Sequence, residues 1–463
     1  MKFISILTIL LFVFSYQADA QSYKISVEVE NLKDTTIYLG HHLGNGFFVD
    51  DSVKLSNNGK AVFEGNKTLA GGIYFILLDR GKYFDFLIDK HQDFSIKCDT
   101  SDFLNTVRFK DSFQNYKFFS YQKYLNNLYK LISLLKEKQK SVISNFDSLL
   151  IIEQQIQIIN NKIYLKKEEI VNEHPDSLIS VIIKSSIPIV PPPAERDTAG
   201  NIIDSLYEFY YYKAHFFDNI NFNDERLIRS SIIYNKISDY LNNLTPPYID
   251  SIKLGTDYII SKSQVNEEVY KYVISMLFNE YRTSRIITDE NIFVYIAENY
   301  YLNNKTPWIS DEFKEVLIKN IELRKPNLIG NIAPEIKMEN SIGKIINLSE
   351  IQNKHVIIYF YNTDCEICKI VTPEMNNFYK IIQDRGVSLI GIYTGENKSE
   401  WLNYISEKNL KNWVNVWDPK NQSQYRELYN INGTPVIFLI DEDRKIIAKK
   451  ITLEQLMNYF NSI

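Results

Sequence analysis

The sequence contains few cysteines, and this scarcity limits how the chain can be stabilised. Only three occur among 463 residues, which excludes a fold held together by several disulfides. Two of the three form one C-x-x-C motif, so Cys98 stands alone. The chain must instead be stabilised by buried apolar cores, for which its 45% hydrophobic content is sufficient.

Basic tracts are absent as well. Lysine and arginine together number 52 against 57 acidic residues, which gives a formal net charge of −5. Nucleic-acid binding surfaces carry clustered positive charge. Nucleic acid is therefore not an expected partner.

The sequence has one long apolar run, at residues 3–14, and it is too short to span a membrane. An A-x-A motif ending at Ala20 follows it, and this order is typical of a secretory signal peptide. No cysteine near the cleavage site offers a lipid attachment point. We therefore expect residues 1–20 to be removed after Ala20 and the protein to be periplasmic.

The chain is too long for one domain of common size, and its periodicity changes along its length. Residues 21–108 alternate apolar and polar side chains, with a hairpin signal at 56–59, which predicts an antiparallel β-sandwich. Residues 109–328 have apolar residues at helical spacing, clearest at 116–140 and 151–171, which predicts an all-α module.

The C-x-x-C motif of Cys365 and Cys368 directly follows an apolar, β-branched run and precedes a helical pattern. A strand would thus deliver Cys365 to the first turn of a helix, where free N–H groups and the helix dipole favour a thiolate. The thiolate is the species that attacks disulfides. We predict that Cys365 is the nucleophile and that Cys368, one turn inward, resolves the mixed disulfide.

Two prolines add to this pattern. Pro373 falls inside the predicted helix, where it would kink it. Pro435 follows Thr434 at the start of a later apolar strand, and an X-Pro bond is the usual site of a cis peptide.

Residues 329–463 resemble the thioredoxin fold, in the TlpA/ResA-like branch of thiol-disulfide oxidoreductases. The residues that carry the resemblance are Ala333-Pro334, Cys365-Glu366-Ile367-Cys368-Lys369, Pro373, Trp417-Asp418-Pro419, Leu428-Tyr429-Asn430-Ile431-Asn432-Gly433-Thr434-Pro435 and Leu439-Ile440-Asp441. The resemblance implies an α/β domain with a reactive Cys365–Cys368 pair. It also implies that Thr434, before a cis Pro435, faces the cysteines and binds an extended substrate. The family usually has Trp where Asp364 stands.

The two upstream modules resemble uncharacterised modules that precede TlpA-like domains in some Gram-negative envelope proteins. That resemblance implies no activity. We expect Lys325-Pro326-Asn327 to be the linker into the redox domain.

Asp364 and Glu366 flank the nucleophile, and two interpretations stay open for them. Carboxylates beside a thiolate raise its pKa, which makes the couple more reducing. This effect and that of the helix terminus should roughly cancel, so we expect a potential closer to that of thioredoxin than of a strong oxidant. Alternatively, both carboxylates are only solvated surface.

Other chemistries fit the motif less well. Structural zinc needs four ligands, but Cys98 lies in another module and His355 in a predicted strand, so we expect no metal and no cofactor. A peroxiredoxin would need Pro and Thr where Ile358 and Asn362 stand. Cys98 ends an apolar strand and is expected to be a small buried hydrophobe.

The sequence therefore predicts an exported, multidomain thiol-disulfide oxidoreductase that reduces or exchanges disulfides in envelope proteins. A reductant in an oxidising compartment needs a membrane thiol electron donor. The alternative is an envelope binding protein, in which the β and helical modules recognise a protein or glycan and the redox domain is accessory.

Overall fold

The computed structural model describes residues 22–78, 81–143 and 146–463. The predicted signal peptide lies outside these residues. In the described part of the chain, no helix combines the length and apolar character that a membrane crossing requires.

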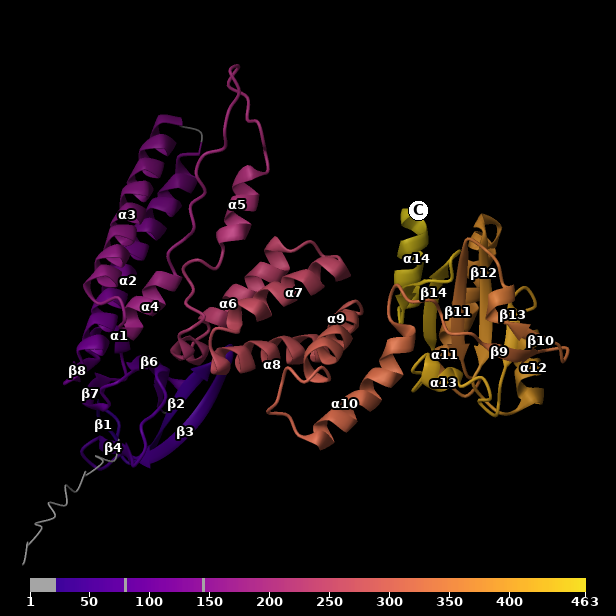
Figure 1. The fold of residues 1–463 in the computed structure, drawn as a ribbon, viewed down its shortest axis with the longest axis horizontal. Coiled ribbons are helices and arrows are strands. Elements are labelled where there is room, and N and C mark those ends of the chain that lie inside the picture. The colour runs from indigo at the N-terminus through magenta and orange to yellow at the C-terminus, as the bar shows by residue number, and fades with distance from the viewer. Residues whose placement is uncertain (1–21, 79–80, 144–145) are drawn as a thin grey trace, which may run out of the picture. The chain divides into compact units, whose positions relative to one another are not determined.

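The chain forms two compact units (Figure 1). The N-terminal unit comprises Met1–Leu244 and Ser261–Tyr272, and the C-terminal unit comprises Thr245–Ile260 and Val273–Ile463. Helices α7 (Ile249–Ser263) and α8 (Glu267–Thr283) contribute residues to both units. The predicted domain boundaries stay predictions.

Two four-stranded sheets in the N-terminal unit share one core, as predicted for a β-sandwich. The sheet orders are β4-β1-β7-β8 and β3-β2-β5-β6. The strands are β1 (Tyr23–Glu30), β2 (Thr36–Leu43), β3 (Gly46–Lys54), β4 (Lys60–Gly65), β5 (Gly72–Leu77), β6 (Tyr83–Ile88), β7 (Asp93–Asp99) and β8 (Arg108–Lys110).

Strand pairing in the sandwich differs from the prediction in two places. β1 pairs with β7 in parallel, so the sandwich is not wholly antiparallel. The turn at 56–59 forms, but it joins β3 of one sheet to β4 of the other and is therefore not a hairpin. β3 instead pairs with β2, and β4 pairs with β1.

The helical part of the N-terminal unit is dominated by two long antiparallel helices, α2 and α3, which extend a few residues beyond the predicted segments (Figure 1). The elements are α1 (Phe103–Thr106), α2 (Phe113–Ser141), α3 (Phe146–Glu173), α4 (Leu178–Ser185), α5 (Tyr207–His215), η2 (Glu225–Arg229), α6 (Ile232–Asp239) and η3 (Tyr240–Leu244).

In the C-terminal unit, helices precede the redox domain without a loose linker. These elements are α9 (Asp289–Ile296), η4 (Ala297–Tyr301), α10 (Asp311–Arg324) and η5 (Lys325–Asn327). The predicted linker is thus a 3-10 turn. Asn327 is fully buried, and its Nδ2 donates to the Leu428 carbonyl at 2.9 Å. The same Nδ2 also donates to the Leu323 carbonyl of α10 at 3.0 Å, so Asn327 fixes this segment to the elements on both sides of it.

The C-terminal sheet has seven strands in the order β10-β9-β13-β12-β11-β14-β15, and it confirms the predicted thioredoxin-like fold. Its strands are β9 (Lys337–Asn340), β10 (Ile345–Asn347), β11 (His355–Tyr361), β12 (Val387–Tyr393), β13 (Val414–Trp417), β14 (Val436–Asp441) and β15 (Ile446–Lys449). Its helices are η6 (Leu348–Glu350), α11 (Glu366–Ile382), η7 (Gln383–Arg385), α12 (Lys398–Glu407), α13 (Tyr425–Leu428) and α14 (Leu453–Ser462).

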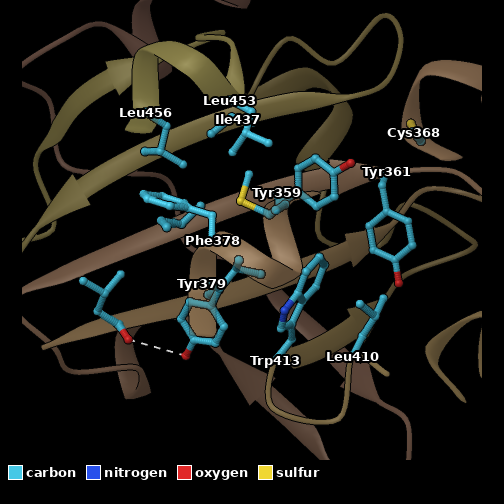
Figure 2. Close-up of a cluster of buried hydrophobic side chains, with 14 of the residues drawn as sticks. Tyr359, Tyr361, Cys368, Phe378, Tyr379, Leu410, Trp413, Ile437, Leu453 and Leu456 are labelled. Carbon is cyan, nitrogen blue, oxygen red and sulfur yellow. Dashed lines mark hydrogen bonds between the residues drawn. The ribbon is translucent and has the colours of Figure 1, made fainter. Parts of the chain in front are cut away.

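Strand β11 is central, parallel to β12 and antiparallel to β14, and all its residues are buried. Its alternate side chains enter two different cores. Ile357 and Tyr359 belong to the cluster that contains Cys368 and residues of α11 and α14 (Figure 2), while Ile358 belongs to the other. A strand covered on both faces needs an uninterrupted apolar sequence, which explains the run before the motif.

Candidate active site

Cys365 occupies the N-cap position of α11, shortly after β11 ends. Its backbone is extended, and its sulfur accepts the Cys368 N–H at 3.1 Å. The sulfur thus takes the role that an oxygen has in most N-caps. This geometry agrees with the predicted placement of the nucleophile at a helix terminus. Pro373 lies inside the same helix.

Cys365 and Cys368 form a disulfide, and the two sulfurs have different surroundings. Cys365 is partly exposed, whereas Cys368 is fully buried in the cluster of Figure 2. Only Cys365 can therefore be reached by a bulky substrate. This difference supports the predicted division of roles.

The segment before β14 brings Thr434 and Pro435 to the cysteine pair. The Thr434–Pro435 peptide is cis, as predicted. The Thr434 carbonyl oxygen lies 3.2 Å from Cys365 Sγ, so it can accept a hydrogen bond from the reduced thiol. β14 is antiparallel to β11, and this pairing joins two segments distant in the sequence at one site.

The two thiols have pKa values displaced in opposite directions. Burial opposes ionisation of Cys365, but hydrogen bonds with Cys368, Thr434 and the Ile367 N–H outweigh it and hold the pKa of Cys365 below its usual value. Burial, followed by the neighbouring Cys365 sulfur, raises the pKa of Cys368 to about 11. The site therefore favours a thiolate at Cys365 and a protonated thiol at Cys368.

Both acidic residues that flank Cys365 are at the surface. Glu366 is 84% exposed and pairs with Lys369 at 2.6 Å. Asp364 is exposed, and its N–H donates to Asn362 Oδ1 at 3.2 Å. The lowered pKa of Cys365 has its cause in hydrogen bonds. An effect of the two carboxylates on the redox couple stays a prediction.

Hydroxyl groups near Cys368 were not anticipated from the sequence. Tyr359 and Thr372 share a hydrogen bond of 3.0 Å, and the Tyr404 hydroxyl lies 3.5 Å from the Cys368 carbonyl oxygen. Tyr359 and Thr372 are fully buried. Burial raises the pKa of Tyr359, so its phenol stays neutral. A tyrosine within a buried strand needs a hydrogen-bond partner for its hydroxyl. The position of Tyr359 in such a strand could therefore have predicted a polar partner such as Thr372.

The structure also describes the surroundings of the two residues that were weighed as metal ligands, His355 and Cys98. His355 is buried in β11, with Nε2 3.1 Å from the Tyr459 hydroxyl. Cys98 is buried in the sandwich, and burial raises its pKa to about 12. Over the described ranges, no group of three or more His, Cys, Asp or Glu side chains could hold a metal ion.

A redox-active cysteine pair at the N-terminus of a helix, beside a cis-proline and a central buried strand, defines a redox protein of the thioredoxin fold. The AhpC/TSA family matches residues 329–449. The thiol-disulfide oxidoreductase ResA of Bacillus subtilis is 31% identical over 137 residues, which are 29% of this chain and 75% of ResA. ResA of Bacillus cereus is 30% identical over 138 residues, 29% of this chain and 78% of that protein. The chain belongs to the TlpA/ResA-like thiol-disulfide oxidoreductases.

Solved structures and two further families also match. A domain of a possible thiol-disulfide isomerase from Cytophaga hutchinsonii is 30% identical, covering 29% of this chain and 92% of that one, with a TM-score of 0.28. A thioredoxin-like protein from Bacteroides caccae is 17% identical, covering 59% and 98%, with a TM-score of 0.43. Residues 23–118 and 200–327 match domains of unknown function (DUF4369 and DUF5106).

The opposed pKa shifts predict selective alkylation of the reduced protein. Cys365 should react with iodoacetamide much faster than Cys368 near neutral pH, because only a thiolate reacts and the pKa of Cys368 is about 11. Since the pKa of Cys365 is lowered, its labelling rate should rise with pH through a midpoint below that of Cys368 and below that of an ordinary free thiol. Peptide mass spectrometry over a pH series measures both rates. Faster labelling of Cys368 would reverse the roles.

Proposed function

We propose that this oxidoreductase works in the cell envelope, where it reduces or exchanges disulfides of other exported proteins. The observation that carries the proposal is the exposure of Cys365 beside the Thr434 carbonyl, with Cys368 buried behind it. Membership of the family implies disulfide-bearing protein substrates. The envelope location rests on the signal-peptide pattern ending at Ala20.

The chemistry is a two-step exchange. The Cys365 thiolate attacks one sulfur of a substrate disulfide, forming a mixed disulfide and releasing the other substrate sulfur as a thiolate, which takes up a proton. Cys368 then loses its proton and attacks Cys365, which releases the second substrate thiol and leaves Cys365–Cys368 oxidised. Each turnover therefore consumes one dithiol. For repeated reduction, we propose that a membrane thiol donor restores it.

The substrate proposal can be tested by capture in cells. A chain carrying Cys368→Ser keeps its nucleophile but cannot resolve the mixed disulfide, so substrates should accumulate on Cys365. Envelope proteins recovered under non-reducing conditions and released by a reductant are the expected result. The matched control is Cys365→Ser, which should capture nothing. Equal capture by both variants would contradict a role for Cys365.

The location makes a separate prediction about the N-terminus. The mature protein should begin at Gln21, because a signal peptidase cleaves after the A-x-A motif. Mass spectrometry of the protein isolated from a periplasmic fraction measures this directly. Retention of Met1, or recovery only in the cytoplasm, would overturn the envelope proposal without affecting the redox chemistry.

A further inference from the structure

A cavity of about 630 Å³ lies among the helices that precede the redox domain. Its walls come from α8, α9, η4, α10 and the loop before α10, and Figure 1 labels the three α-helices. All lining residues fall within 275–324, which belongs to the C-terminal unit. Pockets for small organic ligands typically enclose about 300–1,000 Å³. The cavity therefore has the size of a small-molecule site.

Four aromatic rings line the cavity and pack on one another. The ring centroid of Phe278 lies 4.3 Å from that of Tyr301 and 5.2 Å from that of Phe293. The ring centroid of Phe313 lies 6.2 Å from that of Phe278. Phe313 is 40% exposed, whereas the other three rings are buried. These four rings, which we call the aromatic wall, thus extend from the interior to the solvent.

The mouth of the cavity is apolar as well. Phe313 and Val316 both line it, and they lie three residues apart on α10, so their side chains share one side of that helix. Val316 is 58% exposed. Large apolar side chains around a concave site, with a few polar groups among them, are typical of ligand pockets.

The only charged residues that line the cavity are Arg282 and Arg324. Arg324 already has a counter-ion, because its Nη1 lies 3.1 Å from Glu290 Oε1. Arg282 is exposed in the last turn of α8, and its Nη2 donates to Asn279 Oδ1 at 3.3 Å. Among the residues that the structure describes, no carboxylate forms an ion pair with Arg282. The wall thus carries one cation that a ligand can neutralise.

The carboxylates in neighbouring positions do not line the cavity. Asp311 and Glu312 begin α10 directly after the lining residue Ser310, and Glu280 is about 200° around α8 from Arg282. Within segment 275–324, which the structure describes throughout, no Asp or Glu is a lining residue. The charge of the lining is therefore positive, and an anion complements it.

We propose that this cavity binds an aromatic carboxylate, with its ring against the aromatic wall and its carboxylate on Arg282. Aromatic rings attract one another in offset or edge-on contact, which orients the ligand. A guanidinium donates to both oxygens of a carboxylate, which fixes its other end. A neutral ligand would leave Arg282 without a counter-ion, and an aliphatic anion would forgo the ring contacts. None of the lining residues belongs to the redox site.

The same chemistry occurs in a free aromatic acid and at the C-terminus of a protein that ends in an aromatic residue. Isothermal titration calorimetry of the full chain should therefore use naphthoate for the first source and N-acetyl-Ala-Phe for the second. The corresponding amides are the controls, since amidation removes the charge and keeps the ring. At least one acid should bind about 10-fold or more tightly than its amide, because charge-assisted hydrogen bonds are the stronger kind.

Substitution of the arginine tests its role. Arg282→Gln should reduce the affinity for the acid to that for the amide, and Arg282→Lys should retain part of the difference, because lysine keeps the charge without the planar fork. The matched control is Arg285→Gln. Arg285 is also exposed but does not line the cavity, so the affinity of the parent should persist. Circular dichroism checks that each variant is folded.

A second variant tests the mouth of the cavity without touching the arginine. Val316→Glu places a carboxylate where the ligand enters, so the affinity for the acid should fall about 10-fold or more, by repulsion and by loss of apolar contact. Ile318→Glu is the matched control. Ile318 is 42% exposed on the same helix, but it lies about 200° around α10 from Val316 and does not line the cavity.

The two probes also identify the source. Binding of naphthoate alone assigns a free acid, and binding of N-acetyl-Ala-Phe alone assigns a protein C-terminus. Three results would overturn the site: no binding of either acid at millimolar concentration, equal affinities of the parent for acid and amide, or a preference for the acid that survives in Arg282→Gln.

Discussion

Replacing Cys365 by serine should abolish disulfide reduction, with a loss on the order of 10³-fold or more. The serine hydroxyl is not ionised near neutral pH, whereas hydrogen bonds lower the pKa of Cys365 and supply a thiolate. Insulin reduction with dithiothreitol as electron source measures the rate. When the reduced Cys368→Ser variant is mixed with insulin without dithiothreitol, it should accumulate one mixed disulfide per chain, which intact mass spectrometry detects.

Cys98 provides the matched control for this experiment. It is the third cysteine of the chain, and it is buried in the sandwich of the other unit. Cys98→Ala should keep the insulin-reduction rate of the parent, since its sulfur has no part in the exchange. A large loss of activity in Cys98→Ala, or activity surviving in Cys365→Ser, would contradict the assignment of the redox pair.

Removing the charge of Glu290 should destabilise the C-terminal unit by about 3–5 kcal/mol, because it leaves a buried ammonium without its counter-ion. Lys449 in β15 is 1% exposed, and its Nζ pairs with Glu290 of α9 and lies 2.9 Å from Asn327 Oδ1. Burial lowers the pKa of Lys449 despite the opposing effect of Glu290. Arg324 also pairs with Glu290, at 3.1 Å.

A double-mutant cycle isolates this interaction. Glu290→Gln alone should carry the full cost, whereas Glu290→Gln with Lys449→Met should recover most of it, because no buried charge then lacks a partner. All four tryptophans belong to the C-terminal unit, so their fluorescence during urea unfolding reports on that unit. They are Trp308, Trp401, Trp413 and Trp417.

The exposed pair of Lys398 and Glu339 is the control for the cycle. The Lys398 ammonium and the Glu339 carboxylate are 2.6 Å apart, and their side chains are 44% and 36% exposed. Glu339→Gln should change the unfolding free energy by less than about 1 kcal/mol. Equal losses of unfolding free energy in Glu290→Gln and Glu339→Gln would show that burial does not increase the contribution of the Glu290–Lys449 pair.

The active site was predictable because its signals are local. The apolar run of β11, the spacing of Cys365 and Cys368, and the Thr-Pro before β14 each follow from a short segment. These local signals could not predict the hydrogen bonds around Cys365. The contact between Cys365 and the Thr434 carbonyl joins distant segments, and it helps set the pKa of the thiol.

The upstream fold was predictable in type but not in pairing. Alternation in β1 and β7 indicates that each has a buried face, yet nothing in either strand states that they pair in parallel. Similarly, the predicted turn at 56–59 forms, but pairing with distant strands decides to which sheet β3 and β4 each belong. Lys449 illustrates the same limit, since a lysine in a sequence is expected at the surface.

The buried Lys449 has a consequence for where this protein can be divided. A fragment cut at residue 329, where the family match begins, retains both reactive cysteines but loses Glu290 and Asn327. The Lys449 ammonium would then be exposed to water, on a surface that α9 and η5 cover in the full chain. We therefore expect a fragment that begins at α9 to be more stable than one that begins at residue 329, because it keeps both contacts of Lys449.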